Sequence, residues 1–217
     1  KLRRTPSSEG NRRTFTFSTW CKRSSLGKGG SSGTDYNYLM GAFVSAGGST
    51  DDSHYFALGF FNSDALGVGG WATNWRITNR LFRDTAAWMH LVLQVDTTQG
   101  TADNRVRLYV NGVEETAFST KNNPSQNYDL AINNTVQHAI SDTAYDAGTG
   151  PYHFDGYMAE THFFDGAVVA ASEFGETDAT TGQWIPKKYT GTSSYGTNGY
   201  YMKYVSGAIG TDSSGQG

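Results

Sequence analysis

The sequence has few of the residues that cross-link a chain, span a membrane or bind nucleic acid. Its 217 residues include a single cysteine, Cys21, so stability must come from a packed core and not from an internal disulfide. No apolar run approaches the roughly 20 residues needed to cross a bilayer, so we expect no membrane insertion. The 17 Lys and Arg are outnumbered by 20 Asp and Glu. A nucleic-acid partner would require a strongly basic face, so we expect none.

What the chain does contain is typical of β structure. Proline is scarce, at 4 residues, whereas 27 glycines supply turns and 13 Tyr, 12 Phe and 5 Trp supply the large side chains that pleated surfaces favour. A chain of this length can form one large all-β domain. We therefore predict an all-β fold with one core and very little helix.

The clearest local pattern is a hairpin. From Arg105 to Val110, apolar and polar residues alternate, as in a strand with one buried face. Asn111-Gly112 supplies the two positive-φ residues of a type I′ turn, and the chain is predicted to return from Val113 to Phe118. Residues 88–96 should pair beside this hairpin in a meander.

The remaining elements are predicted from alternation and turn residues. Strands are expected at residues 14–22, 38–46, 54–62, 65–68, 152–164 and 199–205, and short strands with a rim loop between residues 118 and 152. Residues 168–174 could form one helical turn, with Ser172 as its cap and Gly175 as its stop.

The hairpin motifs carry a resemblance to a known family. Trp88-Met-His-Leu-Val-Leu-Gln-Val-Asp96 followed by Leu108-Tyr-Val-Asn-Gly-Val113 resembles the laminin G-like members of the concanavalin A-like lectin/glucanase superfamily, and residues 154–166 resemble that family's last core strand. Residues 4–17 and 174–191 resemble the version carried by virion and tail proteins of aquatic bacteriophages. The resemblance implies a two-sheet antiparallel β-sandwich, or jelly roll.

The domain organisation follows from this resemblance and from the ends of the chain. We expect an N-terminal arm at residues 1–13, a single laminin G-like domain at 14–205 and a linker at 206–217 that leads to a missing downstream region. The absence of an initiator Met also suggests a module of a longer polypeptide.

Catalysis is not expected. The superfamily's glucanases use two carboxylates on one strand, roughly 5–5.5 Å apart in a retaining enzyme. Glu160 has Met158 and His162 two residues away, and in a regular strand Asp155 and Asp165 would lie on the opposite face. We expect Glu160 to be a structural carboxylate held by backbone or Arg donors. His90 and His162 lie in strand patterns and should be structural, and no nucleophile elbow or phosphate-binding loop is present in the sequence.

The resemblance implies a possible structural calcium ion at the sandwich rim, because calcium prefers oxygen ligands from flexible loops. The candidate ligands are Asp51 with Asp52, Asp96 with Asp103 and Asn104, and Asp142 with Asp146. The alternative is that these carboxylates cap their own turns. No other cofactor is expected.

Carbohydrate binding requires an aromatic platform with hydrogen-bonding groups on rigid loops. One Gly-flanked loop offers such a set, and three tyrosines could join from neighbouring loops. The candidates are Trp71, Asn74, Trp75 and Arg76 in the loop, with Tyr36, Tyr145 and Tyr152 from elsewhere. Alternatively, Trp71 or Trp75 could plug the end of the sandwich or an interface.

These observations favour a non-catalytic structural module of a phage virion, a tail or capsid fibre component on the particle surface. Its expected partners are a host-surface glycan, for adhesion, and other virion proteins. A purely structural decoration or assembly module is the alternative, and a polysaccharide-degrading enzyme is the third reading, which would require two carboxylates in one pocket.

The N-terminal arm bears on assembly. It is basic and poor in apolar residues, with Lys1, Arg3, Arg4, Arg12 and Arg13. We expect it to dock on an acidic surface of this domain or of a neighbouring copy. The resemblance implies a homo-oligomer, commonly a trimer, so we predict a cyclic homo-oligomer with the arm at or near the interface.

Overall fold

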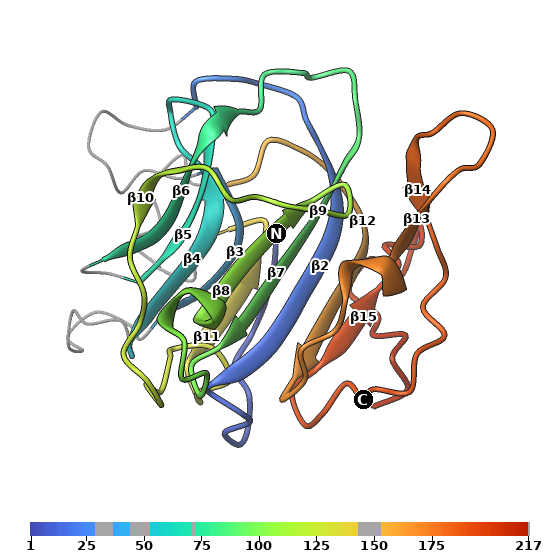
Figure 1. The fold of residues 1–217 in the computed structure, drawn as a ribbon. Helices are drawn as coiled ribbons and strands as arrows, with labels where there is room; N and C mark the ends of the chain where they lie inside the picture. Colours follow the sequence, from blue (N-terminus) through green and yellow to red (C-terminus); the bar gives the residue numbers. More distant parts are fainter. Residues whose placement is uncertain (29–36, 44–52, 71–72, 143–152, 217) are drawn as a thin grey trace.

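The computed structural model describes residues 1–28, 37–43, 53–70, 73–142 and 153–216, and these form a sandwich of two antiparallel sheets (Figure 1). In spatial order, the first sheet, sheet A, contains β1 (Leu2–Arg4), β11 (Gln137–Ile140), β3 (Asn37–Phe43), β4 (Tyr55–Phe60), β5 (Ala65–Gly69), β6 (Asn74–Leu81) and β10 (Phe118–Lys121). Sheet B contains β15 (Tyr200–Met202), β12 (Gly156–Asp165), β2 (Thr14–Arg23), β7 (Met89–Asp96), β8 (Val106–Val110) and β9 (Val113–Glu114). The predicted all-β sandwich is confirmed.

Only short elements lie outside the two sheets in the described part of the chain. These are the hairpin of β13 (Gly175–Thr177) and β14 (Trp184–Pro186) and the 3₁₀ turns η1 (Ala102–Arg105) and η2 (Ala171–Glu173). Within the described residues, no helix has the length and apolar character to span a membrane.

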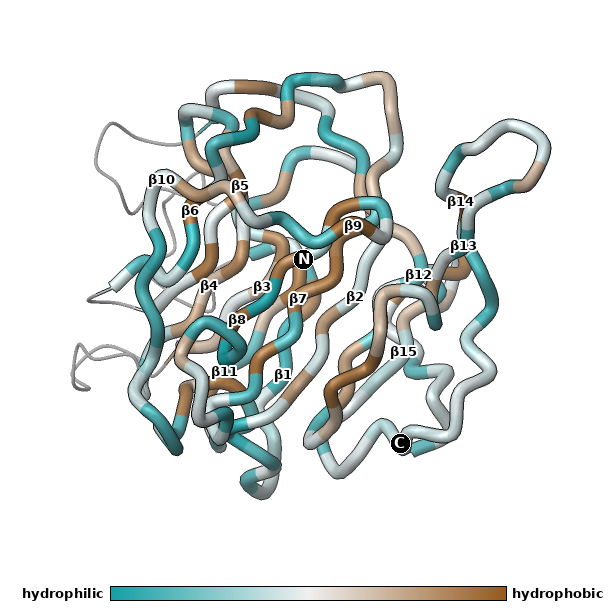
Figure 2. Tube along the Cα trace, viewed as in Figure 1, coloured by the Kyte–Doolittle hydropathy of each residue, from teal (hydrophilic) through white to brown (hydrophobic). Residues whose placement is uncertain are grey.

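The core lies between the inner faces of the two sheets. In β2, Phe15, Phe17 and Cys21 alternate toward the core, as the pattern predicts, and all three are fully buried. Phe15 contacts Phe56 of sheet A edge to face, with ring centroids 5.5 Å apart, so the two sheets are in direct contact. Figure 2 shows that hydrophobic stretches lie mainly on the strands, and hydrophilic ones on the loops. Burying each such ring contributes about 1.5–3 kcal/mol.

The central hairpin is confirmed at its turn and corrected at its return strand. Asn111 and Gly112 have φ values of 50° and 78°, and β8 pairs with β7 in the predicted meander. The return strand β9 ends at Glu114, however, and Phe118 begins β10, which pairs with β6 in the other sheet. There the Arg76 guanidinium carbon lies over the Phe118 ring, 5.5 Å from the ring centroid. This contact favours the passage of the chain from sheet B to sheet A.

The predicted helical turn is present but is capped differently. The turn is the short 3₁₀ segment η2, which follows Ala170 without a side-chain cap. Ser172 lies inside the turn and is not its cap, and Gly175 begins strand β13. The prediction of β15 as the strand that closes sheet B is confirmed, because β15 pairs with β12 at the edge of that sheet.

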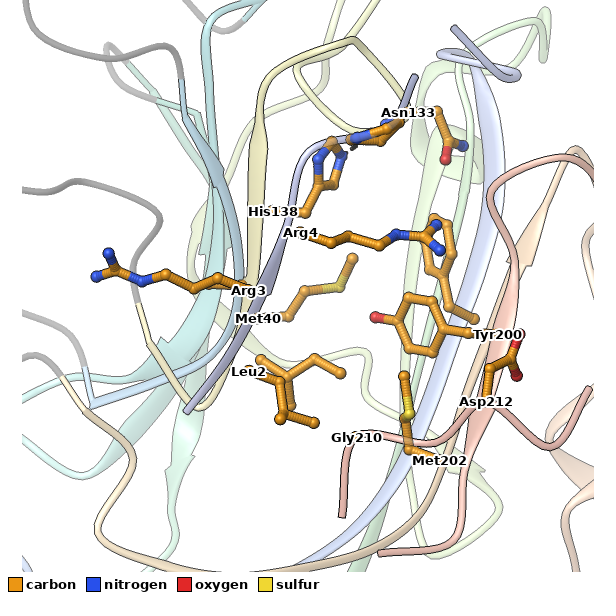
Figure 3. A pocket seen from close by; sticks show the side chains of 14 residues that line it. Leu2, Arg3, Arg4, Met40, Asn133, His138, Tyr200, Met202, Gly210 and Asp212 are labelled. Atoms are coloured by element: carbon orange, nitrogen blue, oxygen red, sulfur yellow. Dashed lines mark hydrogen bonds between the residues drawn. The ribbon is translucent and has the colours of Figure 1, made fainter. Parts of the chain in front are cut away.

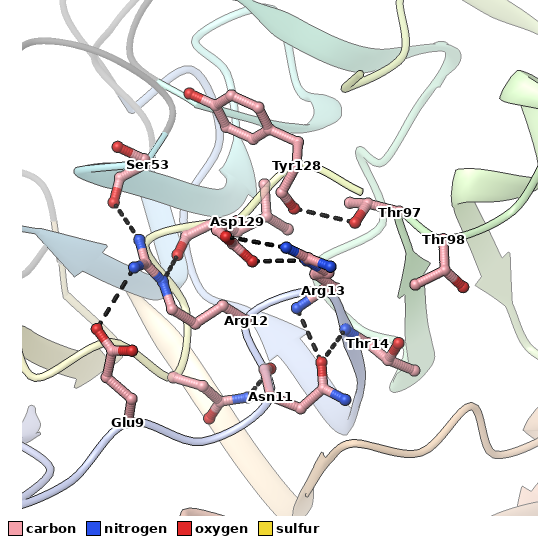
Figure 4. A network of polar contacts seen from close by, with 12 residues as sticks. Glu9, Asn11, Arg12, Arg13, Thr14, Ser53, Thr97, Thr98, Tyr128 and Asp129 are labelled. Carbon is pink, nitrogen blue, oxygen red and sulfur yellow. Dashed lines mark hydrogen bonds and ion pairs between the residues drawn. The ribbon is translucent and has the colours of Figure 1, made fainter. Parts of the chain in front are cut away.

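The N-terminal arm docks on its own domain. Strand β1 pairs with β11, and the Arg3 guanidinium donates to the buried Asp142 carboxylate at 2.6 and 2.9 Å. Figure 4 shows a second anchor, where Arg13 pairs with Asp129 at 2.7 Å and Arg12 donates to Glu9 and to main-chain carbonyls. The basic arm was expected to dock on an acidic surface of this domain or of a neighbouring copy. In the structure it pairs with acidic groups of its own domain.

Candidate functional site

The predicted aromatic loop is corrected where the structure describes it. Asn74 begins strand β6, so it, Trp75 and Arg76 lie in a strand and not in a loop. The Trp75 side chain is fully buried in the core, with its ring centroid 6.0 Å from that of Phe56. A ring without exposed surface cannot stack on a ligand. For Trp75 the alternative therefore holds, because its ring fills the sandwich interior.

Arg76 is also committed to the fold. Its side chain is 1% exposed, and its guanidinium donates to the carbonyl oxygens of Trp75 and Val106 and to Asn123 Oδ1, at 2.8, 3.0 and 2.7 Å. Burial lowers the pKa of Arg76, and the nearby Asp103 carboxylate opposes this shift. This side chain ties β6 to neighbouring segments and is not available to a ligand.

Of the other predicted contacts, the structure describes Asn74. Asn74 is half-buried, and its carbonyl oxygen accepts a hydrogen bond from Asn122 Nδ2 at 3.0 Å. Trp71, Tyr145 and Tyr152 lie outside the described residues, as does Tyr36.

The carboxylates of β12 each have separate hydrogen-bond donors. The strand has a β-bulge between Ala159 and His162, and Glu160 has a φ of 48°, so the strict alternation assumed for this strand does not hold across Glu160. Glu160 accepts a hydrogen bond from the Tyr201 hydroxyl, and not from the backbone or Arg donors expected. Asp165 is 7% exposed and accepts from main-chain N–H groups and an amide side chain; its donors are Asn11 N, Asn133 Nδ2 and Asn198 N.

The two strand histidines are structural, as predicted. His90 Nε2 lies 2.8 Å from Ser18 Oγ, and its Nδ1 accepts from Trp184 Nε1 at 3.1 Å, which fixes the ring between Trp20 and Trp184. His162 stacks on Tyr201, with centroids 4.0 Å apart. Burial lowers the pKa of each imidazole to about 3, so both are neutral.

Of the calcium candidates that the structure describes, Asp96 caps its own turn, whereas Asp103 and Asp142 accept from side chains of distant segments, Asp142 from Arg3. Asp96 accepts hydrogen bonds from Thr14, Thr98 and Gln99, and these outweigh the effect of burial and lower its pKa. Asp103 accepts from Lys121 and Asn123. Asp51, Asp52 and Asp146 lie outside the described residues. Among the residues that are described, no group of three or more His, Cys, Asp or Glu side chains is arranged to bind a metal ion.

A different pair of aromatic residues is exposed on sheet B. Trp88 is 43% exposed and Tyr157 is 61% exposed, and their ring centroids lie 6.5 Å apart with planes inclined at 52°. Tyr157 pairs with Lys22 in the β12–β2 ladder, and Trp88 continues β7 beyond the Cys21–Met89 pair, so the two aromatics flank Lys22 on neighbouring strands. We call Trp88, Lys22 and Tyr157 the aromatic surface.

The backbone holds the aromatic surface in place. Asp84 Oδ1 accepts hydrogen bonds from the N–H groups of Ala86 and Ala87, which orders the turn that leads into Trp88. Gly156 immediately precedes Tyr157, and a Cβ atom on Gly156 would lie 2.2 Å from the Lys22 carbonyl oxygen. The close approach of β12 to β2 therefore requires glycine at this point.

Polar groups border the rings. Lys22 is half-buried between them, and its side-chain nitrogen is a hydrogen-bond donor. Asp155 is exposed, two residues before Tyr157, and its Oδ2 accepts from Ser25 Oγ at 2.6 Å. The aromatic surface thus combines two exposed rings with a hydrogen-bond donor, and the Asp155 carboxylate acceptor lies two residues from Tyr157.

Sequence reasoning missed this site because Trp88 and Tyr157 were taken only as strand residues. The alternation of β2 does place Lys22 on the face opposite the core. The sequence does not reveal the register in which β7 and β12 pair with β2, and this register brings residues 88 and 157 to either side of residue 22.

The chain belongs to the concanavalin A-like lectin/glucanases superfamily, whose family model matches residues 4–172. No curated protein sequence matches the chain.

The chain is similar to solved structures at low sequence identity. The carbohydrate-binding module CBM40 of Ruminococcus gnavus IT-sialidase, solved with α2,6-sialyllactose, is 15% identical over 79% of this chain and 95% of its own, with a TM-score of 0.50. A heptameric SAP-like pentraxin from Limulus polyphemus is 13% identical over 77% of this chain and 70% of its own, with a TM-score of 0.49. A proposed carbohydrate-binding protein from Bacteroides ovatus is 19% identical over 77% of this chain, with a TM-score of 0.47, and this chain spans only 41% of its length.

Proposed function

We propose that this domain binds carbohydrate without catalysing a reaction, and that the aromatic surface makes the contact. The observation that carries the proposal is the exposed pair of Trp88 and Tyr157 on a rigid sheet face. Large exposed aromatic groups are costly in water and usually mark a surface that is covered by a partner. Membership of a superfamily that includes lectins makes a sugar a reasonable partner.

The chemistry of the surface fits a pyranose ring. Aromatic rings carry negative charge density on their faces, and the C–H groups on one side of a sugar carry partial positive charge, so the two attract when stacked. Lys22 can donate to ring or hydroxyl oxygens, and Asp155 can accept from hydroxyl groups. A two-ring surface that is open to water favours weak binding at each site.

A non-catalytic role is supported by the carboxylates of β12. Glu160 is engaged by Tyr201, and Asp165 is buried beneath three donors, so neither is poised as an acid or a nucleophile. The family also includes glucanases. Hydrolysis of the bound glycan would overturn this part of the proposal.

We further propose the setting that the sequence motifs suggested, a phage virion module on the particle surface that adheres to a host glycan and contacts other virion proteins. Assembly as a cyclic homo-oligomer, a trimer for example, belongs to the same proposal, because several weak sites acting together raise the avidity. Trp71, Asn74, Tyr145 and Tyr152 remain proposed as further sugar contacts, whereas Trp75 and Arg76 do not.

The test is a glycan array, with host envelope polysaccharides included, that compares the native protein with Trp88→Ala and Tyr157→Ala. Leu81→Ala is the matched control, because Leu81 is 42% exposed, as Trp88 is at 43%, but lies on sheet A. We expect binding by the native protein and the control, and at least about tenfold weaker binding by each aromatic variant.

Two other outcomes have distinct meanings. Failure of the assembled native protein to bind any glycan would contradict carbohydrate binding and favour the purely structural alternative. Equal binding by native protein and both aromatic variants would contradict the assignment of the site.

A further inference from the structure

A cavity of about 350 Å³ lies at the open side of the sandwich, between the edge strands of the two sheets (Figure 3). Strand β1 and its partner β11 form one wall, and β15 with β12 forms the other. The volume is at the lower end of the range for small-molecule sites and equals the liquid volume of about 12 water molecules.

The interior of the cavity is apolar. The side chains of Leu2 and Ile140 come from sheet A, and those of Phe163 and Met202 come from sheet B. Met40 lies between the two walls, as Figure 3 shows. Methionine side chains are flexible and polarizable, so a cavity with two of them can adapt to an aliphatic chain.

One cation lies over the cavity without an acidic partner among the described residues. The exposed Arg4 side chain extends toward Tyr200, with its guanidinium carbon 5.4 Å from the ring centroid. Within the described residues its guanidinium has one hydrogen-bond acceptor, the carbonyl oxygen of Asn198. The remaining N–H groups are available to an anion.

The other ionisable groups around the cavity are occupied. Arg3 turns away from the cavity, as Figure 3 shows, and it pairs with Asp142 at 2.6 Å. His138 accepts from the Asn133 N–H at 3.0 Å, and burial lowers its pKa to about 4, so it is neutral. The Asp212 carboxylate accepts from the Tyr201 and Ser214 N–H groups and from Ser214 Oγ. Among the described residues, Arg4 is therefore the cation at the cavity without an acidic partner, and the Asp212 carboxylate lies in the same lining.

We propose that this cavity binds a small amphiphilic carboxylate, with an aliphatic chain between the sheets and a head group paired with Arg4. Apolar walls with an exposed cation that has no acidic partner match a ligand that is apolar along its length and anionic at one end. This site is separate from the aromatic surface and does not depend on carbohydrate binding.

The probe is octanoate, titrated into the whole protein by isothermal calorimetry, with octanol as the uncharged analogue and acetate as the analogue without a chain. We expect saturable binding of octanoate at one site, about tenfold weaker binding of octanol, and no binding of acetate. Arg4→Gln should weaken octanoate about tenfold and remove its advantage over octanol.

Gly210→Leu tests the location. A Cβ atom at Gly210 would lie 3.5 Å from Leu2 Cδ2, an ordinary contact, so a larger side chain enters the cavity without a backbone clash. We expect this variant to lose octanoate binding. Gly100→Leu is the control, because a Cβ atom there meets nothing within 4 Å, and it should bind as the native protein does.

Circular dichroism establishes whether each variant is folded. If Gly210→Leu does not fold, Leu2→Trp on the three-residue edge strand β1 fills the same cavity from the other wall. Absence of saturable octanoate binding by the native protein, unchanged binding by the folded cavity-filling variant, or equal affinity for octanoate and octanol would overturn the proposal.

Discussion

Replacing Arg23 with Met should destabilise the sandwich strongly, because Arg23 is a fully buried cation at the end of β2. Its guanidinium donates to Asp64 Oδ1 at 2.9 Å and to the Phe82 carbonyl oxygen at 2.6 Å, and it lies 4.5 Å from the Phe60 ring centroid. Methionine retains much of the contact with Phe60 but makes neither hydrogen bond.

The magnitude follows from what remains around Asp64. Breaking a buried ion pair by removing one partner typically costs about 3–5 kcal/mol. Here the Asp64 carboxylate keeps the Gly27 N–H at 2.9 Å and the exposed Arg83 at 3.1 Å, so we expect the lower end, about 3 kcal/mol. For a domain of this size, that loss lowers Tm by about 6–12 °C.

The effect should depend on pH with a definite sign. Burial alone would raise the pKa of Asp64, but hydrogen bonds from Gly27, Arg83 and Arg23 outweigh it, so the folded-state pKa lies below the ordinary value. The carboxylate therefore stabilises the fold above the unfolded pKa of about 3.9 and loses this contribution as pH falls through the lower folded value. The difference between native protein and Arg23→Met should shrink below about pH 4.

Urea unfolding followed by circular dichroism measures both quantities, with Arg23→Met/Asp64→Asn as the second variant. Removing the Asp64 charge, which has lost its buried partner Arg23, should recover at least about 1 kcal/mol relative to the single variant. A loss of less than about 1 kcal/mol in Arg23→Met, with no recovery in the double variant, would refute the reasoning.

Three further predictions concern the buried histidines, the hairpin turn and the buried cysteine. The pKa values of His90 and His162 are lowered to about 3 in the folded protein, so below about pH 6.5 the unfolded chain binds more protons than the folded one. The free energy of unfolding in urea should therefore fall by up to about 2 kcal/mol per imidazole between pH 6.5 and 5, and a flat profile would contradict this. Gly112→Ala should lower the free energy of unfolding by more than about 1 kcal/mol in the same assay, because φ at this position is 78° and the new Cβ atom would lie 2.5 Å from the Trp184 ring. Unchanged stability would count against the turn geometry. Cys21 is fully buried and burial raises its pKa, so a thiol reagent should modify it only at the rate of unfolding; rapid labelling of folded protein would disprove this.

Sequence patterns were sufficient for elements defined by local chemistry. Alternation in residues 14–22 identified β2 and its buried face, and Asn111-Gly112 identified the type I′ turn, because strand periodicity and positive φ are properties of neighbouring residues. The crossing of Phe118 to the other sheet could not be read in this way, since it depends on a contact with Arg76 from a distant segment.

The site was harder to predict than the fold. The glycines at positions 69 and 70, before Trp75, suggested a loop, but burial of Trp75 against Phe56 makes its segment a strand, because tertiary packing outweighs local turn propensity. Trp88 and Tyr157 are separated by 69 positions, and only the pairing of β7 and β12 with β2 places them together.

The most direct test of the account is a crystal structure of the protein with a glycan selected from the array. The account predicts a sugar ring against Trp88 and Tyr157, with its hydroxyl groups within hydrogen-bond distance of Lys22 or Asp155. A sugar bound elsewhere on the domain, with both aromatic rings still exposed to solvent, would contradict it.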